Sequence, residues 1–174
     1  MVRIAGIEKN DFTNGQGTCV SIFLQGCPFH CLGCHNPETW NPNGGVERDE
    51  SELIQEILKA IKANNIQRNL SILGGEPLDT KEKIVFINTL IDQAKQNFPD
   101  IKIFVWTGFH YEDIQDKEEY QYILNNIDYL IEGPFILDQR DITLKWRGSR
   151  NQRVLDMKQS IKKGTIEVYN DKLS

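Results

Sequence analysis

Short apolar segments, most of them ending at or near glycine, alternate with longer amphipathic segments along this 174-residue chain. The apolar segments span residues 18–25, 70–73, 101–106 and 129–131, and each has the length of a β-strand. Between them, residues 50–63, 80–98 and 120–127 carry apolar side chains at helical spacing. Strands that alternate with helices in this way predict parallel βαβ units, and therefore an α/β fold.

The chain is too short for a closed eight-stranded barrel, which typically needs about 250 residues. We expect a single domain over residues 1–174, in which the sequence after about residue 157 carries no usable pattern. The fold should be an open partial (β/α) barrel of mostly parallel strands, or a doubly wound sheet, with an N-terminal β-hairpin that turns at Asn14-Gly15. In either fold, ligands bind at the carboxyl ends of the strands. The groups expected to gather there are Cys27, Gly74-Gly75, Thr107-Gly108 and Gly133-Pro134.

Composition narrows the possible partners. The net charge of −5 weighs against nucleic acid as the main partner. No apolar run reaches the roughly 18–20 residues that span a bilayer, and the first residues lack the pattern of a secretory signal. We therefore expect no membrane partner and a cytoplasmic location.

Three of the four cysteines, Cys27, Cys31 and Cys34, fall within eight residues in the spacing C-x3-C-x2-C. Thiolates are soft ligands suited to zinc, copper(I) and iron–sulfur clusters. One interpretation is a structural zinc site, whose fourth ligand would be His30, His35 or Cys19. The other is a four-iron cluster in which three irons are held by these cysteines and the fourth is open to a substrate. Cys19 lies inside an apolar segment, where we expect it to be a small core residue.

A second candidate site follows the strand expected at residues 70–73, in the turn Gly74-Gly75-Glu76-Pro77. Glycines allow the backbone to approach a ligand closely. The carbonyls of the turn and the carboxylate of Glu76 can accept hydrogen bonds from an ammonium group. Taken alone, a Gly-Gly turn with a proline before a helix is more often structural. Thr107, at the end of the next strand, could line the same pocket.

Taken together, the two sites resemble those of the radical S-adenosylmethionine enzymes. That resemblance implies an open partial barrel of the radical S-adenosylmethionine type and a [4Fe-4S] cluster held by Cys27, Cys31 and Cys34. It also implies that the open iron binds S-adenosyl-L-methionine and that the Gly-Gly-Glu-Pro turn holds its amino group. The residues implied to contact this cosubstrate are Gly33, Cys34, His35, Gly74, Gly75, Glu76 and Thr107.

Three further segments narrow the resemblance to one branch of the family. Residues 33–40 (GCHNPETW) are similar to the G-C-[HY]-N-x-x-T-W run of the glycyl-radical enzyme activases. Residues 128–135 (DYLIEGPF) and 146–153 (WRGSRNQR) resemble segments of the activases that act on anaerobic ribonucleotide reductases.

The branch implies a particular reaction and particular partners. An electron from the cluster would split S-adenosylmethionine, and the resulting 5′-deoxyadenosyl radical would take hydrogen from a glycine of the large subunit of anaerobic ribonucleoside-triphosphate reductase. Reduced flavodoxin or a similar protein would donate the electron. No catalytic residue is expected beyond the cluster ligands, because hydrogen-atom abstraction needs no general base. The alternatives are activation of another glycyl-radical enzyme, such as pyruvate formate-lyase, and a non-enzymatic zinc-binding adaptor.

Residues 138–158 form a basic stretch in an otherwise acidic chain, with six basic and three acidic side chains. Such a stretch is commonly a solvated surface with scattered ion pairs. The functional interpretation is a docking face for the reductase or for an acidic electron donor, with Arg147 and Arg150 as the residues to test.

Overall fold

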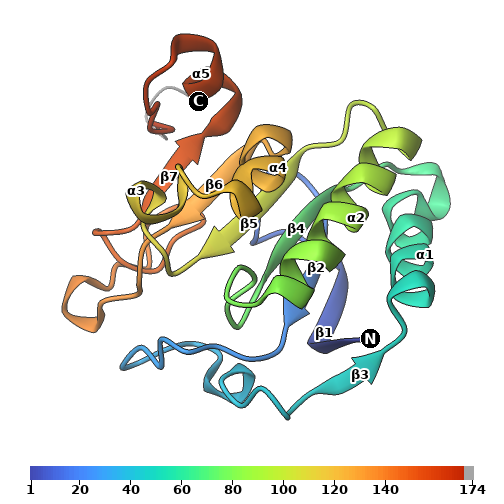
Figure 1. Cartoon of the computed structure of the whole chain (residues 1–174), viewed down its shortest axis with the longest axis horizontal. Coiled ribbons are helices and arrows are strands. Elements are labelled where there is room, and N and C mark those ends of the chain that lie inside the picture. The colour runs from blue at the N-terminus through green and yellow to red at the C-terminus, as the bar shows by residue number, and fades with distance from the viewer. Residues whose placement is uncertain (171–174) are drawn as a thin grey trace.

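The computed structural model describes residues 1–170, and residues 171–174 of the expected domain lie outside the described residues. The described chain is a mixed α/β fold built on one seven-stranded sheet (Figure 1). In chain order its strands are β1 (Val2–Asp11), β2 (Cys19–Leu24), β3 (Val46–Arg48), β4 (Asn69–Gly74), β5 (Ile103–Thr107), β6 (Tyr129–Glu132) and β7 (Arg153–Asp156). Their order across the sheet is β3-β1-β2-β4-β5-β6-β7.

The parallel part of the sheet is its centre. Strands β2, β4, β5 and β6 pair in parallel, as the βαβ pattern predicts. Strands β1, β3 and β7 pair antiparallel with their neighbours. The expectation of mostly parallel strands with an antiparallel N-terminal hairpin therefore holds for the centre and for β1, whereas the antiparallel strands β3 and β7 were not expected. The N-terminal hairpin of β1 and β2 is confirmed.

Helices cover one face of the sheet. The long helices α1 (Glu50–Ile61), α2 (Lys81–Asn97) and α4 (Glu118–Asn126) lie along this face, and the shorter α3 (Tyr111–Ile114) and α5 (Met157–Lys163) lie towards the β7 flank (Figure 1). Short 3-10 turns occupy Pro37–Thr39, Ala63–Asn65 and Leu137–Gln139. Asp49 caps α1 by accepting a hydrogen bond from the backbone N–H of Glu52, as the sequence predicts.

Two apolar layers flank the sheet because its central strands are buried on both faces. In β5, Ile103 and Val105 belong to the main core beneath the helices. Phe104 points to the opposite face, where it packs edge-on against Trp146 with ring centroids 5.1 Å apart. Tyr169 stacks on the other side of this cluster, 5.2 Å from Trp146. Segments near the C-terminus therefore complete the second layer.

Four elements were missed by sequence analysis: β3, α3, β7 and α5. Of these, β7 lies in the basic stretch at residues 138–158, and α5 begins at about the residue after which the sequence carried no usable pattern. Within residues 1–170, none of the helices combines the length and the apolar character needed to cross a bilayer. The expected cytoplasmic location stays a prediction.

Candidate active site

A cavity of about 840 Å³ lies at the carboxyl ends of the parallel strands. It is lined by the strand-end groups that the sequence placed together, namely Cys27, Gly74, Gly75, Thr107, Gly108, Gly133 and Pro134. Cys31, Cys34, His35 and Glu76 also line it, and Leu144 to Gly148 form part of the wall. The gathering of strand ends at one edge of the sheet is thus confirmed.

The cysteine loop is closed at its base by backbone hydrogen bonds. The N–H of Gly26 donates to the carbonyl of Thr39 at 2.7 Å, and the N–H of Cys27 donates to the carbonyl of Trp40 at 3.1 Å. The buried amide of Gln25 adds two more bonds, to the carbonyls of Glu38 (2.8 Å) and Asn41 (2.9 Å). Because both ends of the loop are fixed to the end of β2, its three thiols are held at the cavity.

All three loop cysteines are free thiols that line this one cavity. Burial raises the pKa of the Cys27 thiol. Within residues 1–170, no three His, Cys, Asp or Glu side chains already stand close enough together to hold a metal ion, so ligation by all three cysteines stays a prediction. The donor set nevertheless fits an iron–sulfur cluster, because three soft thiols from one loop face one cavity.

Two of the alternative zinc ligands lie in specific packing environments. Cys19 is fully buried in β2, as expected of a core residue, and it does not line the cavity. His30 has a positive φ of 47° and stacks on Trp40 with ring centroids 4.9 Å apart. His35 lines the cavity beside Phe135, so it faces the same cavity as the three loop thiols.

The Gly-Gly-Glu-Pro turn lies directly against the start of the cysteine loop. The N–H of Gly75 donates to the carbonyl of Leu24, and the N–H of Glu76 donates to the carbonyl of Gly26, each at 2.8 Å. A Cβ atom at Gly75 would stand 2.3 Å from the Gly26 oxygen, and one at Gly74 would stand 2.4 Å from the Leu24 nitrogen. Glycine is therefore required at both positions by the close approach of two backbones.

Glu76 is buried beneath the cavity, and its carboxylate binds groups of the chain itself. One oxygen accepts hydrogen bonds from the Thr107 hydroxyl (2.7 Å) and the Leu78 N–H (2.9 Å), and the other accepts one from the Gly108 N–H (2.7 Å). Burial raises the pKa of this carboxyl to about 7. Glu76 thus ties the end of β4 to the end of β5. A direct contact between its carboxylate and a ligand ammonium group stays a prediction.

Gly33 is the one expected site residue that does not line the cavity. Its φ is +76°, and a Cβ atom there would stand 2.7 Å from Leu137. The structure therefore places Gly33 against the turn at Leu137–Gln139, so that the glycine shapes the loop that carries Cys34.

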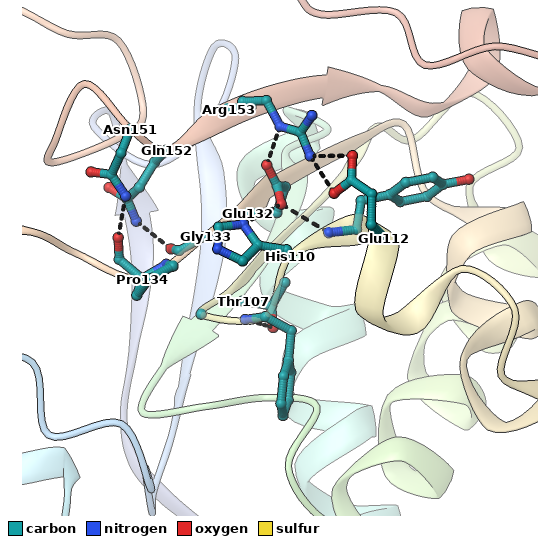
Figure 2. A network of polar contacts seen from close by, with 12 residues as sticks. Thr107, His110, Glu112, Glu132, Gly133, Pro134, Asn151, Gln152 and Arg153 are labelled. Carbon is teal, nitrogen blue, oxygen red and sulfur yellow. Dashed lines mark hydrogen bonds and ion pairs between the residues drawn. The ribbon is translucent and has the colours of Figure 1, made fainter.

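Sequence analysis missed a polar network on the β6–β7 side of the cavity (Figure 2). Fully buried Glu132 accepts hydrogen bonds from Arg153 and from the Tyr111 N–H (2.8 Å), and Arg153 also binds both carboxylate oxygens of Glu112. His110 completes the network, with Nδ1 3.5 Å from the Glu132 carboxylate. The network fixes the ends of β5, β6 and β7 relative to one another.

Next to this network, side chains extend the pairing of β6 and β7 past the last backbone pair, Glu132 and Arg153. The Gln152 amide donates to the Gly133 carbonyl at 2.9 Å, and the Asn151 amide donates to the Pro134 carbonyl at 2.7 Å (Figure 2). We call residues 132–134 and 151–153 the side-chain ladder. The two segments that separately suggested the branch of the family are therefore one structural unit.

The basic stretch contributes more to internal contacts than its charge suggested. Arg153 binds the carboxylates of Glu132 and Glu112, and Lys158 pairs with Asp128 at 2.7 Å. Arg147 donates to the carbonyls of Arg150 (3.2 Å) and Gln152 (2.8 Å). Arg150 is exposed, whereas Arg147 supports the cavity wall. A docking role for this stretch stays a prediction.

Comparison with known proteins identifies the family of the chain. The model of the family described as "4Fe-4S single cluster domain" matches residues 13–155, which places the chain among the 4Fe-4S single-cluster proteins. Anaerobic ribonucleoside-triphosphate reductase-activating proteins of Vibrio cholerae and Haemophilus influenzae are 36% and 37% identical to the chain, over 82% of its length and 90% of theirs. The protein of the same name from Enterobacteria phage T4 is 34% identical, over 83% of this chain and 87% of its own. The chain belongs to the family of anaerobic ribonucleoside-triphosphate reductase-activating proteins.

Proposed function

We propose that this chain is a radical S-adenosylmethionine enzyme that activates anaerobic ribonucleoside-triphosphate reductase. The observation that carries the proposal is the backbone contact between the cysteine loop and the Gly-Gly-Glu-Pro turn, made by the Gly26 carbonyl and the Glu76 N–H. This contact brings a thiol-rich loop and a turn rich in hydrogen-bond acceptors to one cavity. The names of the relatives support the reductase as the partner.

In this proposal Cys27, Cys31 and Cys34 hold the [4Fe-4S] cluster. When bound, the cluster supplies the electron that splits S-adenosylmethionine into methionine and a 5′-deoxyadenosyl radical, which takes hydrogen from a glycine of the reductase. Backbone carbonyls of the turn at Gly74 and Gly75 accept hydrogen bonds from the amino group of the cosubstrate. The Glu76 carboxylate holds Thr107 and Gly108 next to this turn. Cys34 and His35 line the same cavity, and Gly33 lets the loop approach Leu137.

The proposal includes the finer fold class, an open partial barrel of the radical S-adenosylmethionine type. In the described part of the chain the sheet ends at two edge strands, β3 and β7. A radical reaction must be kept from water. We infer that the glycine-bearing segment of the reductase large subunit covers the cavity during the reaction, and that reduced flavodoxin or a similar donor supplies the electron.

Electron paramagnetic resonance tests the proposal. The chain is purified without oxygen, reduced, and mixed with S-adenosylmethionine and the reductase, and a glycyl-radical signal is expected on the reductase. Cys31→Ala should lower bound iron and abolish cosubstrate cleavage. Cys19→Ala is the matched control, because it removes a buried thiol that does not line the cavity, and it should retain both. A colourless, zinc-loaded protein, or full cleavage by Cys31→Ala, would refute the proposal.

A further inference from the structure

Lys83, in the first turns of α2, is a buried cation to which the proposed function gives no role. Only 8% of its surface is exposed. Lysine is seldom buried to this degree unless its ammonium group is fully paired. Three groups accept hydrogen bonds from its Nζ, namely the Gly26 carbonyl (3.0 Å), the Glu76 carbonyl (2.9 Å) and the Asp79 carboxylate (2.7 Å).

These acceptors belong to the two parts of the candidate site. Gly26 precedes Cys27, and its carbonyl also accepts the N–H of Glu76 at 2.8 Å. Glu76 belongs to the Gly-Gly-Glu-Pro turn, so one ammonium group bridges the backbone of the cysteine loop and the backbone of that turn. Asp79 balances the charge of the ammonium group, with a side chain that is 14% exposed. Hydrogen bonds from a charged donor are about twice as strong as neutral ones, so the ammonium group adds a strong link to the backbone bonds that already join the two segments.

We propose that Lys83 is a positioning residue that fixes the distance between the cluster-binding loop and the cosubstrate-binding turn. The inference rests on the proposed function, because it assigns those two roles to the two segments. The cluster and S-adenosylmethionine must meet in one geometry, and misplacement by about 1 Å can slow a reaction about 100-fold. Without the ammonium group, the Glu76 carbonyl loses a donor and the turn keeps its backbone bonds through Gly75 and Glu76. The turn can then shift relative to the loop while both remain folded.

The test compares Lys83→Met with Lys81→Met, which changes an exposed lysine on the same helix. The three measurements are iron per chain, the affinity for S-adenosylmethionine, and the change in the spectrum of the reduced cluster when the cosubstrate is added. Mutating the groups that orient the ligands of a metal typically costs about 10–100-fold in affinity or activity, and we expect an effect of this size for a group that orients the cosubstrate-binding turn. We expect Lys83→Met to retain iron and to bind the cosubstrate at least about 10-fold more weakly. Lys81→Met should match the wild type in all three measurements.

The outcomes separate the two proposals. An affinity for S-adenosylmethionine within about twofold of the wild type in iron-loaded Lys83→Met would overturn the positioning role. If Lys83→Met does not fold, the same measurements are made on Asp79→Asn. That variant keeps the lysine but removes the carboxylate charge that holds its ammonium group in place. In that variant, weaker cosubstrate binding with normal iron supports the role, and unchanged binding overturns it. If the wild type itself holds no cluster and binds no S-adenosylmethionine, the proposed function fails, and this inference fails with it.

Discussion

Replacing Gly75 by alanine tests how closely the cosubstrate turn must approach the cysteine loop. The added Cβ would stand 2.3 Å from the carbonyl oxygen of Gly26, 2.8 Å from its carbonyl carbon and 3.1 Å from the Thr39 oxygen. Ordinary contacts of a Cβ atom begin near 3.4 Å, so the turn must move away by about 1 Å. All three atoms are backbone, and no side-chain rotation can relieve the clash.

The size of the effect follows from this displacement. Overpacking at a well-packed position typically costs about 1–3 kcal/mol, and a contact with rigid backbone belongs at the upper end, near 3 kcal/mol. The bonds from Gly75 to Leu24 and from Glu76 to Gly26, both 2.8 Å, would lengthen together. A displacement of about 1 Å at a reacting centre corresponds to a loss of about 100-fold in the rate of cosubstrate cleavage.

Two other glycines provide matched controls. A Cβ at Gly6 meets nothing within 4 Å, and Gly6→Ala should leave both stability and cleavage rate unchanged. The three atoms nearest to a Cβ at Gly108 all belong to the side chain of Phe29, the nearest at 2.7 Å. Because that side chain can move, Gly108→Ala should fall between the two. The assays are urea unfolding and the rate of S-adenosylmethionine cleavage without the reductase. A Gly75→Ala variant that matches Gly6→Ala in both assays would refute the steric argument.

Two further predictions concern buried carboxylates. Arg153→Met leaves the buried Glu132 carboxylate without the arginine that pairs with it, and should lower the free energy of unfolding by about 3 kcal/mol. The double variant Arg153→Met with Glu132→Gln should recover part of this loss. An equal loss in the single and the double variant would contradict the pairing. Burial raises the pKa of Glu76 from 4.5 to about 7, so the folded metal-free chain keeps a proton that the unfolded chain releases between these values. Protonated Glu76 therefore favours the folded state below pH 4.5, and this contribution to the free energy of unfolding should be lost as the pH rises to 7. At 1.36 kcal/mol per pH unit, the loss over this range is about 3 kcal/mol. Urea unfolding across this range should show the loss in the wild type and a flatter curve in Glu76→Gln.

Much of the fold could be predicted from the sequence because the pattern is local. Apolar segments followed by Gly74-Gly75, Thr107-Gly108 and Gly133-Pro134 identified β4, β5 and β6, and Asp49 marked the start of α1. By contrast, β7 has only four residues, with Arg153 and Asp156 at its ends. Its pairing with β6 joins residues distant in sequence, and no local periodicity reveals such a strand.

The site divides in the same way. The cysteine spacing and the Gly-Gly-Glu-Pro turn are local, and the sequence predicted that they would meet. The hydrogen-bond partners of Glu76 and Lys83 depend on which strand ends and loops lie together in the fold. The sequence around these two residues therefore did not predict the partners. Arg147 and Arg153 were interpreted by charge as surface residues, whereas tertiary contacts make them supports of the cavity wall.

The side-chain ladder at residues 132–134 and 151–153 also leaves the outermost part of the excursion at residues 135–150 replaceable, whereas Leu137 and Trp146 within it pack against the rest of the molecule. The base of this excursion is closed by Asn151 and Gln152, which bind backbone carbonyls, and by the side chains of Arg147 and Ser149. Ile142, nearer its tip, is 85% exposed. Doubling the length of a loop costs only about 0.6 kcal/mol in closure entropy. The cysteine loop is anchored separately, at the end of β2. During evolution the exposed tip of this excursion can therefore diverge in length and sequence, and follow a changing partner, while the cavity wall and the chemical centre are inherited intact.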